Sequence, residues 1–201
     1  MKKLAFPLIV VILLAALFPA MVAAAEPDRP QIAKLIAGKN LQVGEVWVWN
    51  DGEELHVKYR AFYNDLGYCL SETHMHVADS LAAIPQKNGN PIPGQFDYKD
   101  EDLDCARVVE YVVPLNDWTP GTELFIAAHA VVINKFDPDY EETAWGVLCG
   151  KIDVYGFPGK NWAAYIPYTV REFVSESASA TYLQNAYSVV FLPRVVRSTV
   201  Y

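Results

Sequence analysis

Hydrophobic and polar residues alternate along much of this chain in the pattern that half-buried β-strands produce. The run from Val43 to Trp49 is rich in β-branched and aromatic residues, and residues 54–63 alternate, apart from Phe62, after the turn Asn50-Asp51-Gly52. Two such runs joined by this turn predict a β-hairpin. The apolar residues of the second run share one face and its charged residues share the other, so the pattern predicts that His56 is solvent-exposed.

Further along the chain, Leu124 to Ile133 has apolar residues in both alternating sets. This pattern predicts a central strand that is covered on both faces, with His129 drawn inside. Val108 to Leu115 predicts another strand, and Ile152 to Tyr155 and Trp162 to Val170 predict the last ones.

Long connections separate these strands. Residues 84–98 contain three prolines and two glycines, which predicts a long ordered loop. No strand is predicted for residues 134–150, which contain Asp137-Pro138-Asp139. The acidic run from Asp97 to Asp104 lacks the spacing and the glycine of a calcium loop, so a solvated loop is expected there. Together these features predict an all-β fold, a two-sheet antiparallel β-sandwich (jelly-roll or immunoglobulin-like) with long loops.

Composition divides the chain into four parts. A positive start, an apolar run and Ala23-Ala24-Ala25 predict a secretory signal peptide over residues 1–25, with an uncleaved membrane anchor as the alternative. Residues 26–37 are expected to form a polar lead-in segment, and residues 38–171 the β-sandwich domain. Residues 172–201 are expected to form a serine-containing linker and a C-terminal apolar segment. No transmembrane segment is expected in the mature chain.

The predicted signal peptide places the protein outside the cell or at the cell surface. Removing two lysines and no acidic residue with it changes the formal charge from −8 to −10. An acidic domain repels phosphate backbones, so nucleic acid is excluded as an expected partner. The sequence does not identify a partner, and the candidate classes are a surface polysaccharide and another extracellular protein.

Three cysteines, Cys69, Cys105 and Cys149, are expected in an oxidising compartment. They allow one disulfide and one remaining thiol, and spacing alone does not select the pair. Pairing of Cys69 with Cys149 is favoured because each borders a polar motif, and three buried free thiols are the alternative.

The candidate chemistry lies in the strand that contains Glu72, His74 and His76. Side chains at every second position of a strand share one face, so these three point the same way. With His129 from a neighbouring strand, the two histidines and either Glu72 or Glu142 would form a set of three or four ligands suited to zinc or another divalent metal.

A structural role accounts for the same residues and is preferred. A buried histidine needs partners for its ring nitrogens, and nearby carboxylates and hydroxyls supply them. No Gly-x-Ser-x-Gly motif or other recognisable nucleophile setting is present, so no catalytic residue is assigned and an enzyme is the less favoured function. No cofactor is expected, and a divalent metal is the alternative.

Aromatic residues provide a second kind of candidate site, because exposed rings stack on sugars while buried rings fill the core. Trp118 lies in a predicted turn and is the main candidate for ligand binding, together with Trp145. Trp47 and Trp49 share one strand face and are expected in the core.

Six motifs in a fixed order resemble a widespread domain of secreted and cell-surface microbial proteins that has no established activity. They are Asn50-Asp51-Gly52, Ser71-Glu72-Thr73-His74, Gly89-Asn90-Pro91-Ile92-Pro93-Gly94-Gln95-Phe96, Ala127-Ala128-His129-Ala130-Val131-Val132, Glu142-Thr143-Ala144-Trp145-Gly146 and Phe157-Pro158-Gly159-Lys160-Asn161-Trp162-Ala163. The resemblance covers residues 38–171 and implies a secreted β domain without catalytic residues. That family often has histidine where this chain has Asp100, which weakens any metal scheme with a ligand there.

The expected function is therefore a secreted or cell-surface β-sandwich module with a binding or structural role. The alternative is a divalent-metal-binding domain, with hydrolase activity as its extension, centred on Glu72, His74, His76 and His129.

Overall fold

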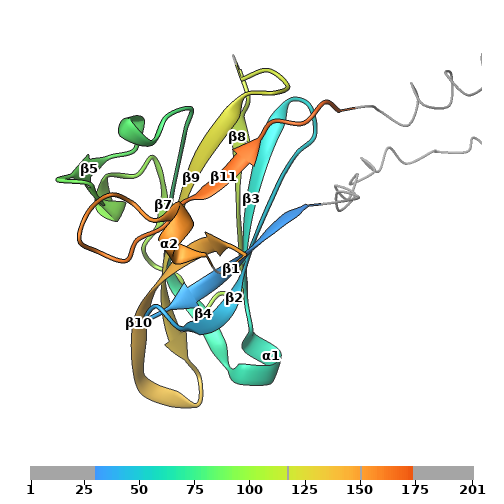
Figure 1. Cartoon of the computed structure of the whole chain (residues 1–201). Helices are drawn as coiled ribbons and strands as arrows, with labels where there is room; N and C mark the ends of the chain where they lie inside the picture. The colour runs from blue at the N-terminus through green and yellow to red at the C-terminus, as the bar shows by residue number, and fades with distance from the viewer. Residues whose placement is uncertain (1–29, 117, 150, 174–201) are drawn as a thin grey trace, which may run out of the picture.

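The computed structural model describes residues 30–116, 118–149 and 151–173, most of which lie in β-strands (Figure 1). The strands are β1 (Gln31–Ala37), β2 (Leu41–Asn50), β3 (Glu54–Ala61), β4 (Tyr68–Ala78), β5 (Gln86–Lys87), β6 (Asn90–Pro91), β7 (Tyr98–Asp100), β8 (Val108–Pro114), β9 (Glu123–Asn134), β10 (Asp137–Leu148) and β11 (Ile166–Thr169). The helices are α1 (Tyr63–Leu66), α2 (Ile152–Tyr155) and the 3₁₀ turns η1 (Leu81–Ala83) and η2 (Pro93–Gln95).

Two predicted segments are not covered by this description. The predicted signal peptide, residues 1–25, lies outside the described residues, as does residue 174 onward of the predicted C-terminal segment 172–201. None of the helices within the described ranges is long and apolar enough to cross a membrane.

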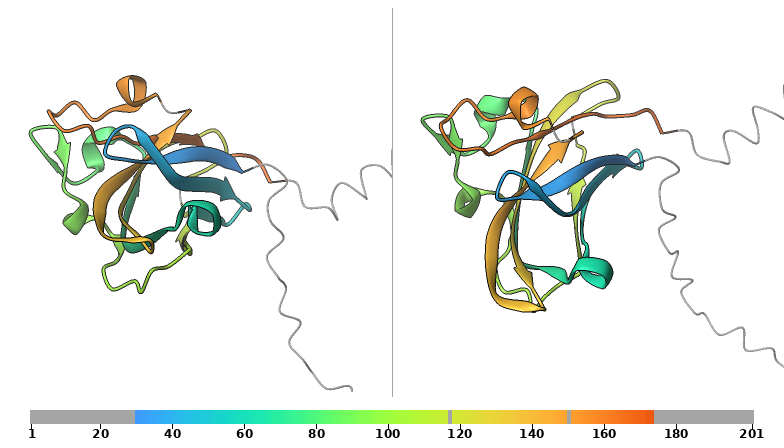
Figure 2. Two further views of the ribbon diagram at one scale, coloured as in Figure 1. Left: turned by 90° about the horizontal axis from the view of Figure 1, so that it is seen from below. Right: turned by 60° about the horizontal axis from the view of Figure 1, so that its bottom comes forward.

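Nine strands join in a single sheet with the order β7-β4-β9-β10-β1-β2-β3-β8, and β11 pairs with β9. All of these pairings are antiparallel. The sheet curls, as Figure 2 shows, until the rings of Tyr98 in β7 and Tyr111 in β8 lie 6.0 Å apart. The all-β antiparallel prediction is confirmed. The division into two facing sheets is not confirmed, because hydrogen bonds join these strands continuously around the curl.

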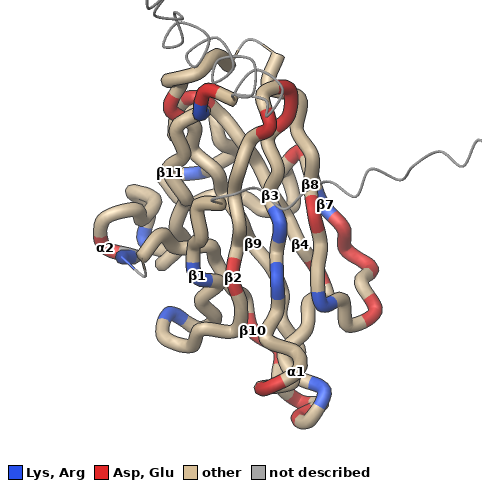
Figure 3. Tube along the Cα trace, turned by 90° about the vertical axis from the view of Figure 1, so that its right-hand side faces the viewer, with Lys and Arg blue, Asp and Glu red and all other residues tan. Residues whose placement is uncertain are grey.

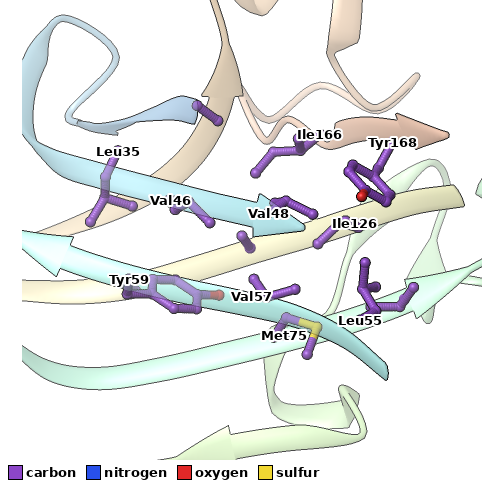
Figure 4. Close-up of a cluster of buried hydrophobic side chains, with 14 of the residues drawn as sticks. Leu35, Val46, Val48, Leu55, Val57, Tyr59, Met75, Ile126, Ile166 and Tyr168 are labelled. Carbon is purple, nitrogen blue, oxygen red and sulfur yellow. The ribbon is translucent and has the colours of Figure 1, made fainter. Parts of the chain in front are cut away.

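Apolar side chains on the inner face of the curled sheet form the main core (Figure 4). Val46 and Val48 from β2 and Val57 and Tyr59 from β3 are all fully buried, and Ile126 from β9 packs in the same cluster. The predicted inward face of residues 54–63 is confirmed for Leu55, Val57 and Tyr59, but β3 ends at Ala61 and Tyr63 begins the helix α1. Burying each such side chain contributes about 1.5–3 kcal/mol to the hydrophobic driving force.

A second apolar cluster lies on the outer face of the same strands. In β9, Ile126 belongs to the main core and the next residue, Ala127, belongs to the second cluster, because successive side chains point to opposite faces. Ile84 and Phe96 from the predicted long loop, and Phe157 from the segment after α2, cover this outer face. The prediction that residues 124–133 form a strand covered on both faces is therefore confirmed.

Several segments differ from the sequence prediction. Tyr98–Asp100, in the run expected as a solvated loop, forms β7, and only Ile166–Thr169 of the predicted strand 162–170 forms a strand, β11. Residues 31–37 of the expected lead-in segment form β1, whose apolar residues Ala33 and Leu35 are fully buried between β10 and β2. Asp137 to Leu148 forms β10, and a register shift between Asp137 and Glu141 accommodates its polar beginning. Ile152 to Tyr155 forms the helix α2 and not a strand.

The disulfide joins Cys69 to Cys105, so the predicted pairing of Cys69 with Cys149 is wrong. Leu70 and Ala106 exchange two backbone hydrogen bonds, of 2.8 and 3.0 Å. This local bridge brings the segment before β8 beside the start of β4 and places the two cysteine Cα atoms 4.9 Å apart. Cys149 is a free, exposed cysteine.

Gly44 in β2 lies where the sheet leaves no room for a side chain. It pairs with Ala61 in β3, and a Cβ atom at residue 44 would overlap the backbone carbonyl oxygen of Arg60. We expect Gly44→Ala to lower the free energy of unfolding by about 1–3 kcal/mol, because overpacking forces the two strands apart. Urea denaturation measures this change, and Gly94→Ala is the control because a Cβ atom there meets nothing within 4 Å. Equal stability of the two variants would contradict the expectation.

Candidate functional site

The structure brings two of the predicted histidines together. His74 in β4 is the direct cross-strand partner of His129 in β9, and their Nδ1 atoms lie 3.3 Å apart in a hydrogen bond. Both side chains are buried. The indole of Trp145 packs against the His129 ring, with ring centroids 4.8 Å apart. The pair therefore lies on the outer face of the sheet, beneath the apolar cover described above.

Burial keeps the His129 ring uncharged at neutral pH. Burial, and secondarily the neighbouring His74 ring, lower the pKa of His129 from 6.5 to about 3. The other ring nitrogen of His74, Nε2, lies 3.2 Å from Oε1 of the exposed Glu101. Hydrogen bonds from His74 and from Lys99 lower the pKa of Glu101. The His74 ring thus links the buried His129 to a solvated carboxylate.

His76, the third predicted ligand, is separate from this pair. Its Nδ1 lies 3.3 Å from Oδ2 of Asp97, but this buried nitrogen makes no hydrogen bond with any residue that the structure describes. Burial lowers the pKa of His76, although the charge of Asp97 opposes that shift. The ring packs against Phe96, with centroids 5.8 Å apart.

The structure does not assemble the predicted metal ligands. Glu72 is half-buried beside a register shift in β4, and Glu142 is exposed near Gly38. Among the described residues, no third histidine, cysteine or carboxylate ligand completes a metal-sized group with His74 and His129. The buried hydrogen-bonded pair instead fits the structural role, and Glu101 is the carboxylate partner of His74.

The sequence prediction missed a second polar cluster, which is built on the β2–β3 hairpin. His56 was expected at the solvent-exposed face, but only 7% of it is exposed. Its ring stacks on Trp49 at 4.7 Å with an interplanar angle of 2°. Its Nδ1 lies 3.1 Å from Oε1 of Glu110 in β8, and its Nε2 lies 3.3 Å from Oδ2 of Asp51 in the turn.

Charged residues surround this cluster on the outer face of β2, β3 and β8. Figure 3 shows basic residues along β3 and acidic residues on the neighbouring strands. Lys58 binds the other oxygen of Glu110 at 2.9 Å, and the guanidinium of Arg60 lies 4.2 Å from the centroid of the Trp47 ring. Trp47 and Trp49 therefore lie on the outer face and not in the main core, and cations cover their rings.

Trp118 borders a hollow of about 450 Å³ at the end of the molecule where the β2–β3 turn meets the chain after β11. We call it the Trp118 pocket. Asp51 and Glu53 line it, together with Trp118, Arg171 and Phe173. Pockets that bind small molecules have this volume and this mixture of aromatic surface with a few polar groups.

Trp145 is not available to a ligand from solution. It is only 6% exposed, and it packs against Phe96 and Phe157 as well as His129. Its predicted role as a ligand-binding ring is therefore wrong, because the long loop covers the strand face that carries it.

A wider hollow, of about 780 Å³, lies between the β1–β2 turn and α2. Lys39, Lys151 and Asp153 line it together with the half-buried Trp162. This second hollow carries more basic than acidic side chains, whereas the Trp118 pocket carries more acidic ones.

Comparison of the chain with protein-family models, curated proteins and solved structures finds no match.

Proposed function

We propose that the protein is a secreted or cell-surface module that binds a saccharide in the Trp118 pocket. The observation that carries this proposal is the position of Trp118, whose partly buried indole forms one wall of a hollow that carboxylates also line. Sugar rings present apolar C–H faces that pack on an indole, and their hydroxyl groups donate hydrogen bonds to carboxylates.

The way the pocket is held together supports a binding role. The side chain of Asn50 donates to the backbone carbonyl of Arg171 at 2.9 Å and accepts from its backbone N–H at 2.9 Å. The Asn50 Oδ1 also accepts from the hydroxyl of Tyr168 at 2.7 Å. These bonds fasten the chain after β11 to the end of β2, so the pocket walls are held in place before a ligand arrives. Preorganisation of this kind lowers the entropic cost of binding.

Two further features support a location outside the cytoplasm. The Cys69–Cys105 disulfide is typical of proteins from oxidising compartments. The N-terminal sequence has the three-part pattern of a secretory signal peptide.

A glycan array followed by titration calorimetry of the best oligosaccharide tests the proposal. We expect Trp118→Ala to weaken binding about tenfold or more, which corresponds to a loss of about 1.4 kcal/mol. Phe136→Ala is the matched control, because Phe136 is 70% exposed and does not line the pocket. Its affinity should equal that of the unaltered protein.

Three results would contradict the proposal. The first is an array without binding, and the second is equal affinity of Trp118→Ala and the unaltered protein. The third is loss of binding in Lys39→Ala with retention in Trp118→Ala, since that would move the ligand to the second hollow.

A further inference from the structure

His56 is held in one orientation by groups on three strands. Its ring stacks on Trp49 of β2, and its Nδ1 meets Oε1 of Glu110 in β8 at 3.1 Å. Lys58 of β3 binds the other carboxylate oxygen of Glu110 at 2.9 Å and so balances its charge. A ring clamped in this way presents its remaining nitrogen, Nε2, in a fixed direction.

The contact between Nε2 of His56 and Oδ2 of Asp51 requires a proton or a cation between the two atoms. If the neutral ring donates its Nδ1–H to Glu110, its Nε2 carries only a lone pair. That lone pair faces Oδ2 of Asp51 at 3.3 Å, and a carboxylate oxygen is also an acceptor. Two acceptors at this distance repel unless a proton or a metal ion lies between them.

The surrounding ligands favour a metal ion. One ligand atom each from Asp51, Glu54 and His56 lie within 4.8 Å of one another. Ligands bound at about 2.0–2.2 Å in a tetrahedral arrangement are separated by about 3.4 Å, close to the spacing of His56 Nε2 and Asp51 Oδ2. We propose that Asp51, Glu54 and His56 bind a divalent transition metal ion of the zinc class, which accepts imidazole and carboxylate ligands.

The groups behind these ligands have the arrangement that metal sites use. A metal-binding histidine commonly donates its other ring N–H to a carboxylate, and Glu110 occupies that position. Asp51 Oδ1 accepts the backbone N–H groups of Glu53 and Glu54, at 3.1 and 2.9 Å, which leaves Oδ2 for the ion. Because Asp51 also lines the Trp118 pocket, the ion would lie beside that pocket. The metal site stands on its own geometry and does not depend on saccharide binding.

Calorimetric titration of the EDTA-treated, dialysed protein with Zn²⁺, in the absence of any saccharide, tests the inference. We expect one equivalent to bind, and we expect His56→Gln and Glu54→Gln each to weaken binding at least a hundredfold. Glu110→Gln should weaken it about 10–100-fold through the orientation of the His56 ring. His76→Gln is the matched control and should bind as the unaltered protein does.

A cobalt titration provides a second readout, because Co²⁺ in a four-coordinate nitrogen and oxygen site produces visible absorption that His56→Gln should abolish. Glu54→Gln leaves the buried ring in place, so it reports on the metal even if His56→Gln fails to fold. Absence of saturable Zn²⁺ binding at neutral pH would overturn the inference. Undiminished binding in His56→Gln or Glu54→Gln would do the same. The ¹⁵N NMR signals of the His56 ring provide a further test. If they are those of an imidazolium and do not change when Zn²⁺ is added, a proton and not a metal ion lies between His56 Nε2 and Asp51 Oδ2, and the inference is wrong.

Discussion

Replacing Cys69 and Cys105 together by serine is expected to lower the free energy of unfolding by about 4 kcal/mol. The bridge spans a sequence separation of 36 residues, and a closed loop of that length removes about this much chain entropy from the unfolded state. For a protein of this size the melting temperature should fall by about 10 °C. Urea denaturation and calorimetry under non-reducing conditions measure both quantities.

Cys149→Ser is the matched control, because Cys149 is exposed and forms no disulfide in the part of the chain that the structure describes. Its stability should equal that of the unaltered protein, and a thiol reagent should modify Cys149 in the folded state while sparing the other cysteines. A large loss of stability in Cys149→Ser, or none in the double variant, would contradict the assigned pairing.

Acidification from pH 6.5 toward pH 3 is expected to destabilise the protein by about 4 kcal/mol through His129 alone. Burial lowers the pKa of His129 to about 3 in the folded state, whereas the unfolded value is 6.5. Between these values the unfolded chain binds a proton that the folded protein does not. The stabilisation is therefore fully present above pH 6.5 and is lost as the pH falls toward 3. Burial lowers the pKa of His76 as well, which adds a contribution of the same sign.

The informative window lies between pH 6.5 and 4.5, where most carboxylates remain ionised in both states. Urea denaturation at half-unit pH intervals should show a steep slope in this window for the unaltered protein and a shallower one for His129→Gln, whose amide can bond to His74. The imidazole proton signals of His129 should not shift above pH 5 in an NMR titration. Titration of His129 near pH 6.5, or equal slopes in the two proteins, would contradict the expectation.

The burial of His74 and His129 could be predicted from the sequence, but their carboxylate partner could not. The alternation along β4 predicted that His74 and Met75 point to opposite faces, and the apolar run of β9 predicted that His129 is buried. In the structure both histidines are buried, and their Nδ1 atoms lie 3.3 Å apart. Glu101 as the carboxylate partner could not be predicted, because it follows β7 and depends on the path of a long loop. The loop that carries Phe96 also decided that Trp145 is buried.

His56 shows the opposite case. Its charged strand neighbours predicted exposure, and alternation did assign it to the outer face correctly. The pattern could not show that Trp49 and Glu110 would cover the ring on that face. A useful signal was present in the turn, since a hairpin closed at Asn50-Asp51-Gly52 brings Asp51 back beside His56.

The sequence by itself determined the β2–β3 hairpin, the strands β4, β8 and β9, the alternation of side chains between the two faces of these strands, the acidic charge and the limit of one disulfide within the chain. These follow from turn chemistry and from a two-residue alternation, which act between neighbours along the chain. The curl of the sheet, the Cys69–Cys105 pairing, the burial of His56 and the Trp118 pocket were decided only by the tertiary structure. Each depends on the distance between segments far apart in the sequence, and that distance is set by how the whole sheet closes around its core.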